Sequence, residues 1–116
     1  MKVLVCGGRA FIDRGLLSSV LDRYDIGDLC IIAGGASGAD LLAGEWAARR
    51  GVCHIAVKAN WDRHGKSAGP LRNTWMLQFC EPDLVIAFEG GRGTADMVRQ
   101  AEAFGVQVIQ PTEVAV

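Results

Sequence analysis

Five short runs of apolar, β-branched residues alternate with longer segments of helical periodicity, and this alternation constrains the fold more than any other feature of the chain. The runs are Lys2–Cys6, Leu29–Ala33, Cys53–Val57, Leu84–Phe88 and Val106–Ile109. Each is too short and too rich in Val and Ile to be a helix of its own. Strands that alternate with helices form βαβ units around a parallel sheet buried on both faces. The sequence therefore predicts an α/β fold.

Four windows between these runs show the three- and four-residue spacing of an amphipathic helix. The first follows Asp13, which is a suitable N-cap. The others are expected over Ala39–Arg50, from Pro70 to near Cys80, and from about Thr94 to Phe104. A chain of 116 residues has the size of one domain. We therefore expect a single Rossmann-like domain over residues 1–116, with helices flanking the sheet.

Glycines gather at the carboxyl ends of three predicted strands. Of the 15 glycines, eight follow the first, second and fourth strands: Gly7, Gly8, Gly34, Gly35, Gly38, Gly90, Gly91 and Gly93. This edge of an open parallel sheet is where ligands bind. The three glycine loops meet there only if their strands are neighbours. We therefore expect a five-stranded sheet in the order 3-2-1-4-5.

A glycine turn that leads from a strand into a helix can form an anion site, because free backbone N–H groups point toward one spot. Residues 87–96 (AFEGGRGTAD) carry the stronger signal, since Thr94 can cap the helix or bind a phosphate oxygen. Residues 31–40 (IIAGGASGAD), which include Ser37 and Asp40, carry a weaker one because they lack GxGxxG spacing. Any one loop is as well explained by a tight turn, but three loops together favour a ligand.

Charge placement indicates the kind of ligand. The formal net charge is −1, which gives no general attraction for nucleic acid or an anionic membrane, and no apolar run approaches the roughly 18–20 residues of a membrane span. Five basic residues nevertheless fall in or beside the loops at the glycine-rich edge: Arg9, Arg63, Lys66, Arg72 and Arg92. A neutral protein with a basic site predicts a phosphorylated small molecule as its partner.

The connection Ala59–Asn73 is the longest, and a long loop in a small domain is usually functional. Trp61 could stack on a base or ribose, or it could cover the apolar edge of the next helix. Arg72 and Asn73 could supply a planar cation and an amide to a phosphate or sugar.

The four cysteines, Cys6, Cys30, Cys53 and Cys80, are widely spaced, with no CxxC pair and no clustered histidine. This spacing argues against a zinc site or a redox motif. We expect reduced, buried thiols in a cytoplasmic protein, and neither a metal nor a separate cofactor.

Four segments together resemble one known family. They are Cys6–Phe11, the sequence AGGASGAD, the sequence ANWDRHGKSAGPLRNTWM and the sequence AFEGGRGTADMV. They look like the YspA-like (YAcAr) family of the SLOG superfamily, a group of Rossmann-like domains for nucleotide ligands. The resemblance implies roles around nucleotide-derived messengers and in phage or plasmid conflict. It also implies a relation to the Lonely Guy phosphoribohydrolases, which cleave nucleoside monophosphates to base and ribose phosphate.

The match to the hydrolase motif PGGxGTxxE is incomplete. Gly90, Gly91, Gly93 and Thr94 resemble its phosphate-binding part, but Glu89 replaces the proline and Met97 replaces the catalytic glutamate. A thioether cannot relay a proton. Hydrolase activity is therefore not carried over to this chain.

These observations lead to two functional hypotheses. The first is a sensor or sequestering module for a phosphorylated, ribose-containing molecule: a nucleotide, an ADP-ribose derivative or a cyclic nucleotide signal. The alternative is an enzyme that cleaves an N-glycosidic or phosphoribosyl bond in the same pocket. It would need a carboxylate, for which Glu89 is the first candidate, followed by Asp96, Asp40 and Asp62. Because only seven residues follow Ile109, no helix is expected to cover that end of the sheet, so we also expect a homo-oligomer.

Overall fold

A computed structural model describes residues 1–111, which contain one five-stranded parallel sheet in the order β3-β2-β1-β4-β5. The strands are β1 (Lys2–Cys6), β2 (Cys30–Ala33), β3 (Cys53–Ala56), β4 (Leu84–Ala87) and β5 (Gln107–Ile109). The predicted α/β class and strand order are confirmed. The order reverses between β1 and β4, so the loops after these two strands flank the topological switch point.

Helices connect the strands. They are α1 (Arg14–Leu21), α2 (Ala39–Arg50), the single turn α3 (Trp61–His64), α4 (Ala68–Trp75) and α5 (Arg92–Ala103). Two 3₁₀ turns, η1 (Ile26–Asp28) and η2 (Gly65–Ser67), and a π-helical turn, η3 (Met76–Cys80), complete the order. Asp13 caps α1 as predicted, because its carboxylate accepts a 2.9 Å hydrogen bond from the amide of Leu16.

Three expectations about helices and their boundaries differ from the structure. The part of the long connection before Pro70, expected to be a loop, is mostly helical, and α4 begins at Ala68 rather than at Pro70. Proline still lies in the first turn, where its missing N–H leaves no hydrogen bond unmade. Helix α5 begins at Arg92, two residues before Thr94.

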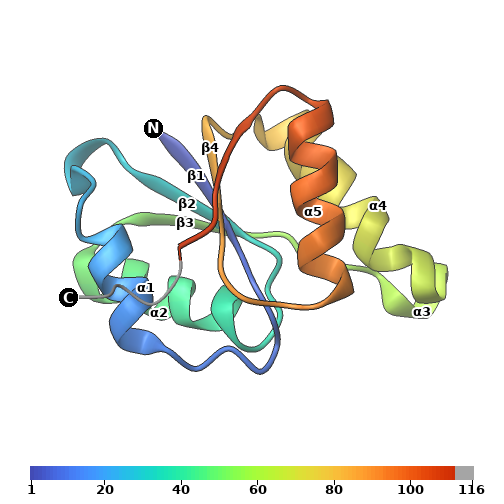
Figure 1. Cartoon of the computed structure of the whole chain (residues 1–116), viewed down its shortest axis with the longest axis horizontal. Helices are drawn as coiled ribbons and strands as arrows, with labels where there is room; N and C mark the ends of the chain where they lie inside the picture. Colours follow the sequence, from blue (N-terminus) through green and yellow to red (C-terminus); the bar gives the residue numbers. More distant parts are fainter. Residues whose placement is uncertain (112–116) are drawn as a thin grey trace.

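Helices cover both faces of the sheet, with α1 and α2 on one face and α4 and α5 on the other (Figure 1). Val3 and Val5 of β1 point into the core under α1 and α2, while Leu4 between them points into the core under α4 and α5. This alternation is what a strand buried on both faces requires. No helix within residues 1–111 is long and apolar enough to cross a membrane.

The edge strand β3 is much less covered than the centre of the sheet. All four of its residues are exposed, whereas all four residues of β4 are buried. The expectation that all the cysteines are buried is wrong: Cys53 is exposed on this edge strand, and Cys6, Cys30 and Cys80 are half-buried. The predicted strand order already placed this strand at the edge, but an apolar run does not show how much of an edge strand the helices leave uncovered.

Candidate functional site

A cleft of about 1660 Å³ opens at the carboxyl edge of the sheet, between the loops that follow β1, β2 and β4 and the segment from α3 to α4. It is larger than the roughly 300–1,000 Å³ of a typical small-molecule site. Most of the residues predicted from the sequence line it: Gly7, Gly8, Arg9, Gly34, Gly35, Asp40, Trp61, Arg72, Glu89, Gly90, Gly91, Arg92, Gly93, Thr94 and Asp96. Three predicted ligand residues do not line it: Ser37, Gly38 and Asn73.

One group of glycines holds the loops together. The Gly8 amide donates a 2.8 Å hydrogen bond to the carbonyl oxygen of Glu89, which joins the loops after β1 and β4. A Cβ on Gly38, where φ is +76°, would overlap the carbonyl oxygen of Gly8. A Cβ on Gly90 would lie 2.5 Å from the Gly8 amide nitrogen. Glycine is required at these positions because three backbones meet there.

A second group of glycines faces open space. Apart from the adjoining residues and the backbone of the same helix turn, no described atom lies within 4 Å of a Cβ added to Gly91 or Gly93. Gly91 is the N-cap of α5, and no side chain caps this helix end. The first-turn N–H groups of α5 therefore meet the cleft without a side-chain acceptor, which is the usual arrangement of an anion site. Of the two roles considered for Thr94, that of helix cap is wrong, because Thr94 is the third residue of α5.

The N-terminus of α2 is already occupied by protein groups. The Ala39 amide donates to the carbonyl oxygen of Gly8 at 3.3 Å, and the Asp40 carboxylate accepts from the Ala36 amide at 3.1 Å. Burial raises the pKa of Asp40, while the Ala36 N–H and the positive charge of Arg72 act in the opposite direction. Of the two glycine-capped helix ends at this edge, α5 is the open one.

Arg72 joins three segments of the cleft wall. Its Nη1 donates to the carbonyl oxygen of Gly34 at 2.8 Å and to that of Val57 at 3.4 Å. Its Nε donates to Oδ1 of Asn73 at 3.0 Å. Burial lowers the pKa of Arg72, and the nearby charge of Asp40 opposes that shift. Arg72 thus lines the cleft as predicted, but these donors bind the protein itself.

The Asp96 carboxylate is fully engaged. It accepts from Nδ2 of Asn73 at 3.0 Å, from Nε2 of Gln100 at 2.7 Å and from Nη2 of Arg99 at 2.5 Å. Asn73 is buried in this network between α4 and α5, which explains why it does not line the cleft. Met97 is also buried, in the core on the α4 and α5 face of the sheet. The position that matches the hydrolase glutamate therefore lies in the core.

Most of the predicted basic residues lie at the cleft. Arg9, Lys66, Arg72 and Arg92 line it, whereas Arg63 does not. Lys58 also lines it and was missed, although a cation directly after the third predicted strand was a usable signal. Phe11 was missed as well, and its ring packs against Phe88 with centroids 5.0 Å apart.

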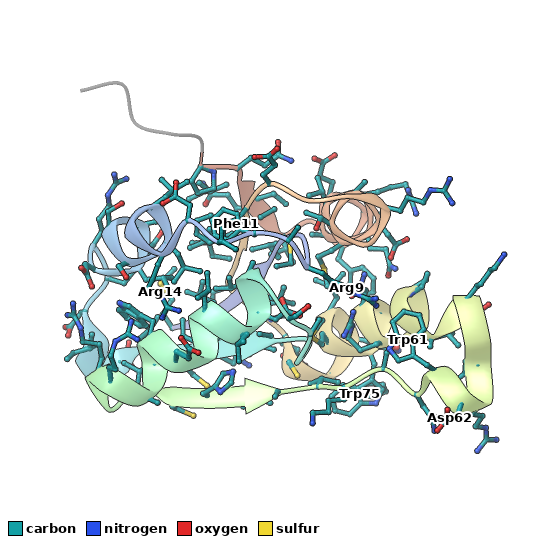
Figure 2. The ribbon with its side chains drawn as sticks, turned by 90° about the horizontal axis from the view of Figure 1, so that it is seen from below. Arg9, Phe11, Arg14, Trp61, Asp62 and Trp75 are labelled. Carbon is teal, nitrogen blue, oxygen red and sulfur yellow. The ribbon has the colours of Figure 1, made fainter. Side chains whose placement is uncertain are left out.

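Trp61 faces Arg9 across the mouth of the cleft (Figure 2). The guanidinium carbon of Arg9 lies 5.3 Å from the centre of the Trp61 ring, which is within cation–π range. The far edge of the ring contacts α4, because a Cβ on Gly69 would lie 3.3 Å from Cη2 of Trp61. Asp62, a candidate carboxylate, does not line the cleft and points outward from α3 (Figure 2).

The comparison with known proteins agrees with the resemblance noted in the sequence. The family model of the YspA, cpYpsA-related SLOG family matches residues 1–64. The chain belongs to this family. A relative of this SLOG chain, the Gene 61 protein of Mycobacterium phage D29, is 37% identical over 119 residues, with 93% of this chain and 94% of the relative covered.

A solved structure shares the SLOG chain's fold. It is the C-terminal domain of a hydrogenase from Pyrococcus furiosus, with a TM-score of 0.57 and 15% identity. The similarity covers 95% of this chain and 90% of that one. At this level of identity the likeness concerns the fold alone.

Proposed function

We propose that this SLOG protein binds a phosphorylated, ribose-containing small molecule at the carboxyl edge of its sheet. One observation carries the proposal: the N-terminus of α5 has no side-chain cap, and Gly91 and Gly93 leave open space beside it. A helix dipole and free N–H groups at such a position favour a phosphate. Membership of the SLOG family is consistent with a nucleotide-related ligand.

The cations at the cleft support the same ligand class. The exposed side chains of Arg9, Lys58, Lys66 and Arg92 line the cleft, while the overall charge of the chain is −1. Local positive charge in a nearly neutral protein favours a small anion over a polyanion such as nucleic acid. The cleft volume of about 1660 Å³ has room for a nucleoside with more than one phosphate.

A sensor or sequestering module fits the residues better than an enzyme does. Asp96 is held by three hydrogen bonds and Met97 is buried in the core, so neither offers a free acid or base. A relative encoded by a phage supports a role in conflict between a phage or plasmid and its host.

Calorimetric titration with AMP, ADP, ADP-ribose and cyclic AMP tests binding. We expect at least one of these compounds to bind, and Gly93→Ala to weaken it about tenfold by placing a methyl group where a phosphate approaches the helix. Gly15→Ala is the matched control, because Gly15 is likewise the second residue of its helix and does not line the cleft. The proposal fails if none of these compounds gives heat or raises the melting temperature.

The enzymatic alternative, N-glycosidic or phosphoribosyl cleavage, rests on Glu89. Its side chain is exposed at the cleft beside the N-terminal loop of α5, and it forms no ion pair within residues 1–111. Incubation of the protein with AMP or NAD, followed by chromatography, detects release of free base. Release that Glu89→Gln abolishes without loss of binding would establish cleavage. Ligand recovered unchanged after long incubation would exclude cleavage and support a role in binding alone.

A further inference from the structure

Two cysteines that lie 23 positions apart in the sequence meet at one end of the sheet. Cys30 opens β2, Cys53 opens β3, and the two are direct register partners in the parallel ladder. Their sulfur atoms lie 3.0 Å apart, with the Cys30 thiol donating to Cys53. Register partners share one face of a sheet, and this face is the one that carries α4 and α5.

The surroundings of the two thiols differ. Cys53 is exposed on the edge strand, and Ile55, two residues along the same face, is 40% exposed. Helix α4 therefore leaves this part of β3 open to small reagents. Cys30 is half-buried, and burial together with the hydrogen bond to Cys53 raises its pKa to about 11. Cys30 thus stays protonated at neutral pH, while Cys53 is the thiol that a reagent reaches first.

We propose that Cys30 and Cys53 form a reversible dithiol/disulfide site that reacts with peroxides. Neighbouring strands are about 4.8 Å apart, within the roughly 4.4–6.8 Å that a disulfide spans between Cα atoms. The site lies at the amino end of β2 and β3, opposite the cleft, and is independent of the proposed ligand.

The reaction has two balanced steps. The Cys53 thiolate attacks one oxygen of hydrogen peroxide, the O–O bond breaks, and hydroxide leaves, so that sulfur is oxidised to a sulfenic acid and the peroxide is reduced. The Cys30 sulfur then attacks the Cys53 sulfur and the S–O bond breaks. The departing hydroxide takes the Cys30 thiol proton and leaves as water. A small dithiol reverses the reaction by thiol–disulfide exchange.

The disulfide would fasten an edge strand to the sheet. All four residues of β3 are exposed, and its hydrogen-bonding partner within the sheet is β2. A covalent link at the start of both strands holds their register and restricts opening of the edge. Oxidation should therefore slow hydrogen exchange at the β3 amides and raise the melting temperature.

Peroxide treatment of the folded full-length chain, followed by peptide mass spectrometry, tests the site. We expect a mass loss of about 2 Da, a Cys30–Cys53 linkage, two remaining free thiols, and recovery with dithiothreitol. In Cys30→Ser, the Cys53 sulfenic acid should persist and react with dimedone, whereas Cys53→Ser should form no disulfide within the chain. Cys80→Ser is the matched control and should behave like the unmodified protein.

Linkage mapping of the unmodified chain needs no substitution. The proposal therefore remains testable even if one of the two single variants folds poorly. A Cys53–Cys80 linkage, a linkage between two chains, or four thiols that survive peroxide would each overturn it. Loss of nucleotide binding would not affect it, since neither thiol lines the cleft.

Discussion

Gly8 and Gly90 meet backbone to backbone at the topological switch point: a Cβ on Gly8 would lie 3.0 Å from the Cα of Gly90. Gly8 and Gly90 are therefore needed for packing, whereas Gly91 and Gly93 leave room for a ligand. Gly90→Ala should lower the free energy of unfolding by about 1–3 kcal/mol, because the methyl group would press on the Gly8 amide and the Thr94 hydroxyl. Urea denaturation measures this loss.

Gly91→Ala is the control for Gly90→Ala. A Cβ on Gly91 would meet no packed neighbour within 4 Å, and the φ of Gly91 is −100°. The variant should therefore lose less than about 1 kcal/mol of unfolding free energy, which is the cost of alanine at an N-cap position. Equal losses in the two variants would contradict the division of the glycines.

Arg72 should prove to be a structural clamp. Arg72→Ala removes hydrogen bonds to Gly34, Val57 and Asn73 and takes away the stronger of the two cationic influences on the buried Asp40 carboxylate, the other being Arg9. We expect a loss of about 2–4 kcal/mol in unfolding free energy. Arg72→Lys should recover only part of it, because an ammonium group cannot reproduce the planar fork of donors.

A double-mutant cycle with Asp40→Asn checks the electrostatic part. Removing Arg72 should cost less when Asp40 carries no charge. If Arg72→Ala unfolds at the same urea concentration as the parent protein, the structural role of Arg72 is wrong. Its guanidinium is then available to bind the ligand.

Cys6 should make stability fall at alkaline pH. Burial, with a contribution from the negative charge of Asp40, raises the pKa of the Cys6 thiol from 9.0 to about 12 in the folded protein. Above pH 9 the unfolded chain loses this proton while the folded chain keeps it, so the stabilisation is complete below pH 9 and is lost as pH rises toward 12. The slope is about 1.4 kcal/mol per pH unit for one thiol.

Cys6→Ala isolates this contribution, because the other titrating groups are the same in both proteins. Its unfolding free energy should fall less steeply than that of the parent between pH 9 and 10.5, as measured by denaturation at several pH values. Parallel pH profiles would refute the assignment to Cys6.

The prediction of a homo-oligomer rests on a different surface once the structure is considered. Part of one sheet face at the last strand was expected to lack a covering helix, but Val106, Val108 and Ile109 pack against the two cores. Instead, α4 and η3 expose Leu71, Trp75 and Phe79 at a spacing of four residues. Such an apolar stripe on one helix face is typical of a protein–protein contact.

Light scattering should give a multiple of 12.4 kDa at high micromolar concentration, and Phe79→Gln should lower the measured mass. A monomer in the parent protein at that concentration would remove the prediction.

The strand order could be predicted because eight glycines mark the ends of strands that must be neighbours. The helical character of residues 61–69 could not, because Gly65, Gly69 and Pro70 are poor helix formers. Tertiary packing overrides that preference: Ala68 and Gly69 are buried, and Gly69 gives room for the ring of Trp61. Propensity alone therefore predicted a loop.

The position of the cleft could be predicted from the sequence, but the role of each residue in it could not. Spacing shows that Gly90, Gly91 and Gly93 share one loop, but only the fold decides that Gly90 touches Gly8 while the other two face open space. Likewise, the meeting of Cys30 with Cys53 depends on the register of β2 and β3, and a shift of one residue would place them on opposite faces.

Arg9 should contribute more to ligand affinity than to stability. Its guanidinium lies over Trp61 at 5.3 Å, at the mouth of the cleft, and a cation–π contact at an exposed site contributes only about 0.5–1 kcal/mol to folding. A charge-assisted hydrogen bond to phosphate contributes about 1.5–3 kcal/mol. For the compound that binds most tightly among AMP, ADP, ADP-ribose and cyclic AMP, Arg9→Ala should therefore weaken Kd at least tenfold.

The matched control is Arg63→Ala, because Arg63 is an exposed cation on α3 that does not line the cleft. Long-range attraction alone would make the two variants lose affinity equally, and 0.5 M salt would then erase the difference from the parent protein. A direct contact predicts instead that Arg63→Ala stays within twofold of the parent. It also predicts that ligand binding changes Trp61 fluorescence in a Trp75→Phe background, since the only other tryptophan, Trp46, is buried. Unchanged Trp61 emission at saturating ligand would place the ligand away from the Arg9 and Trp61 pair.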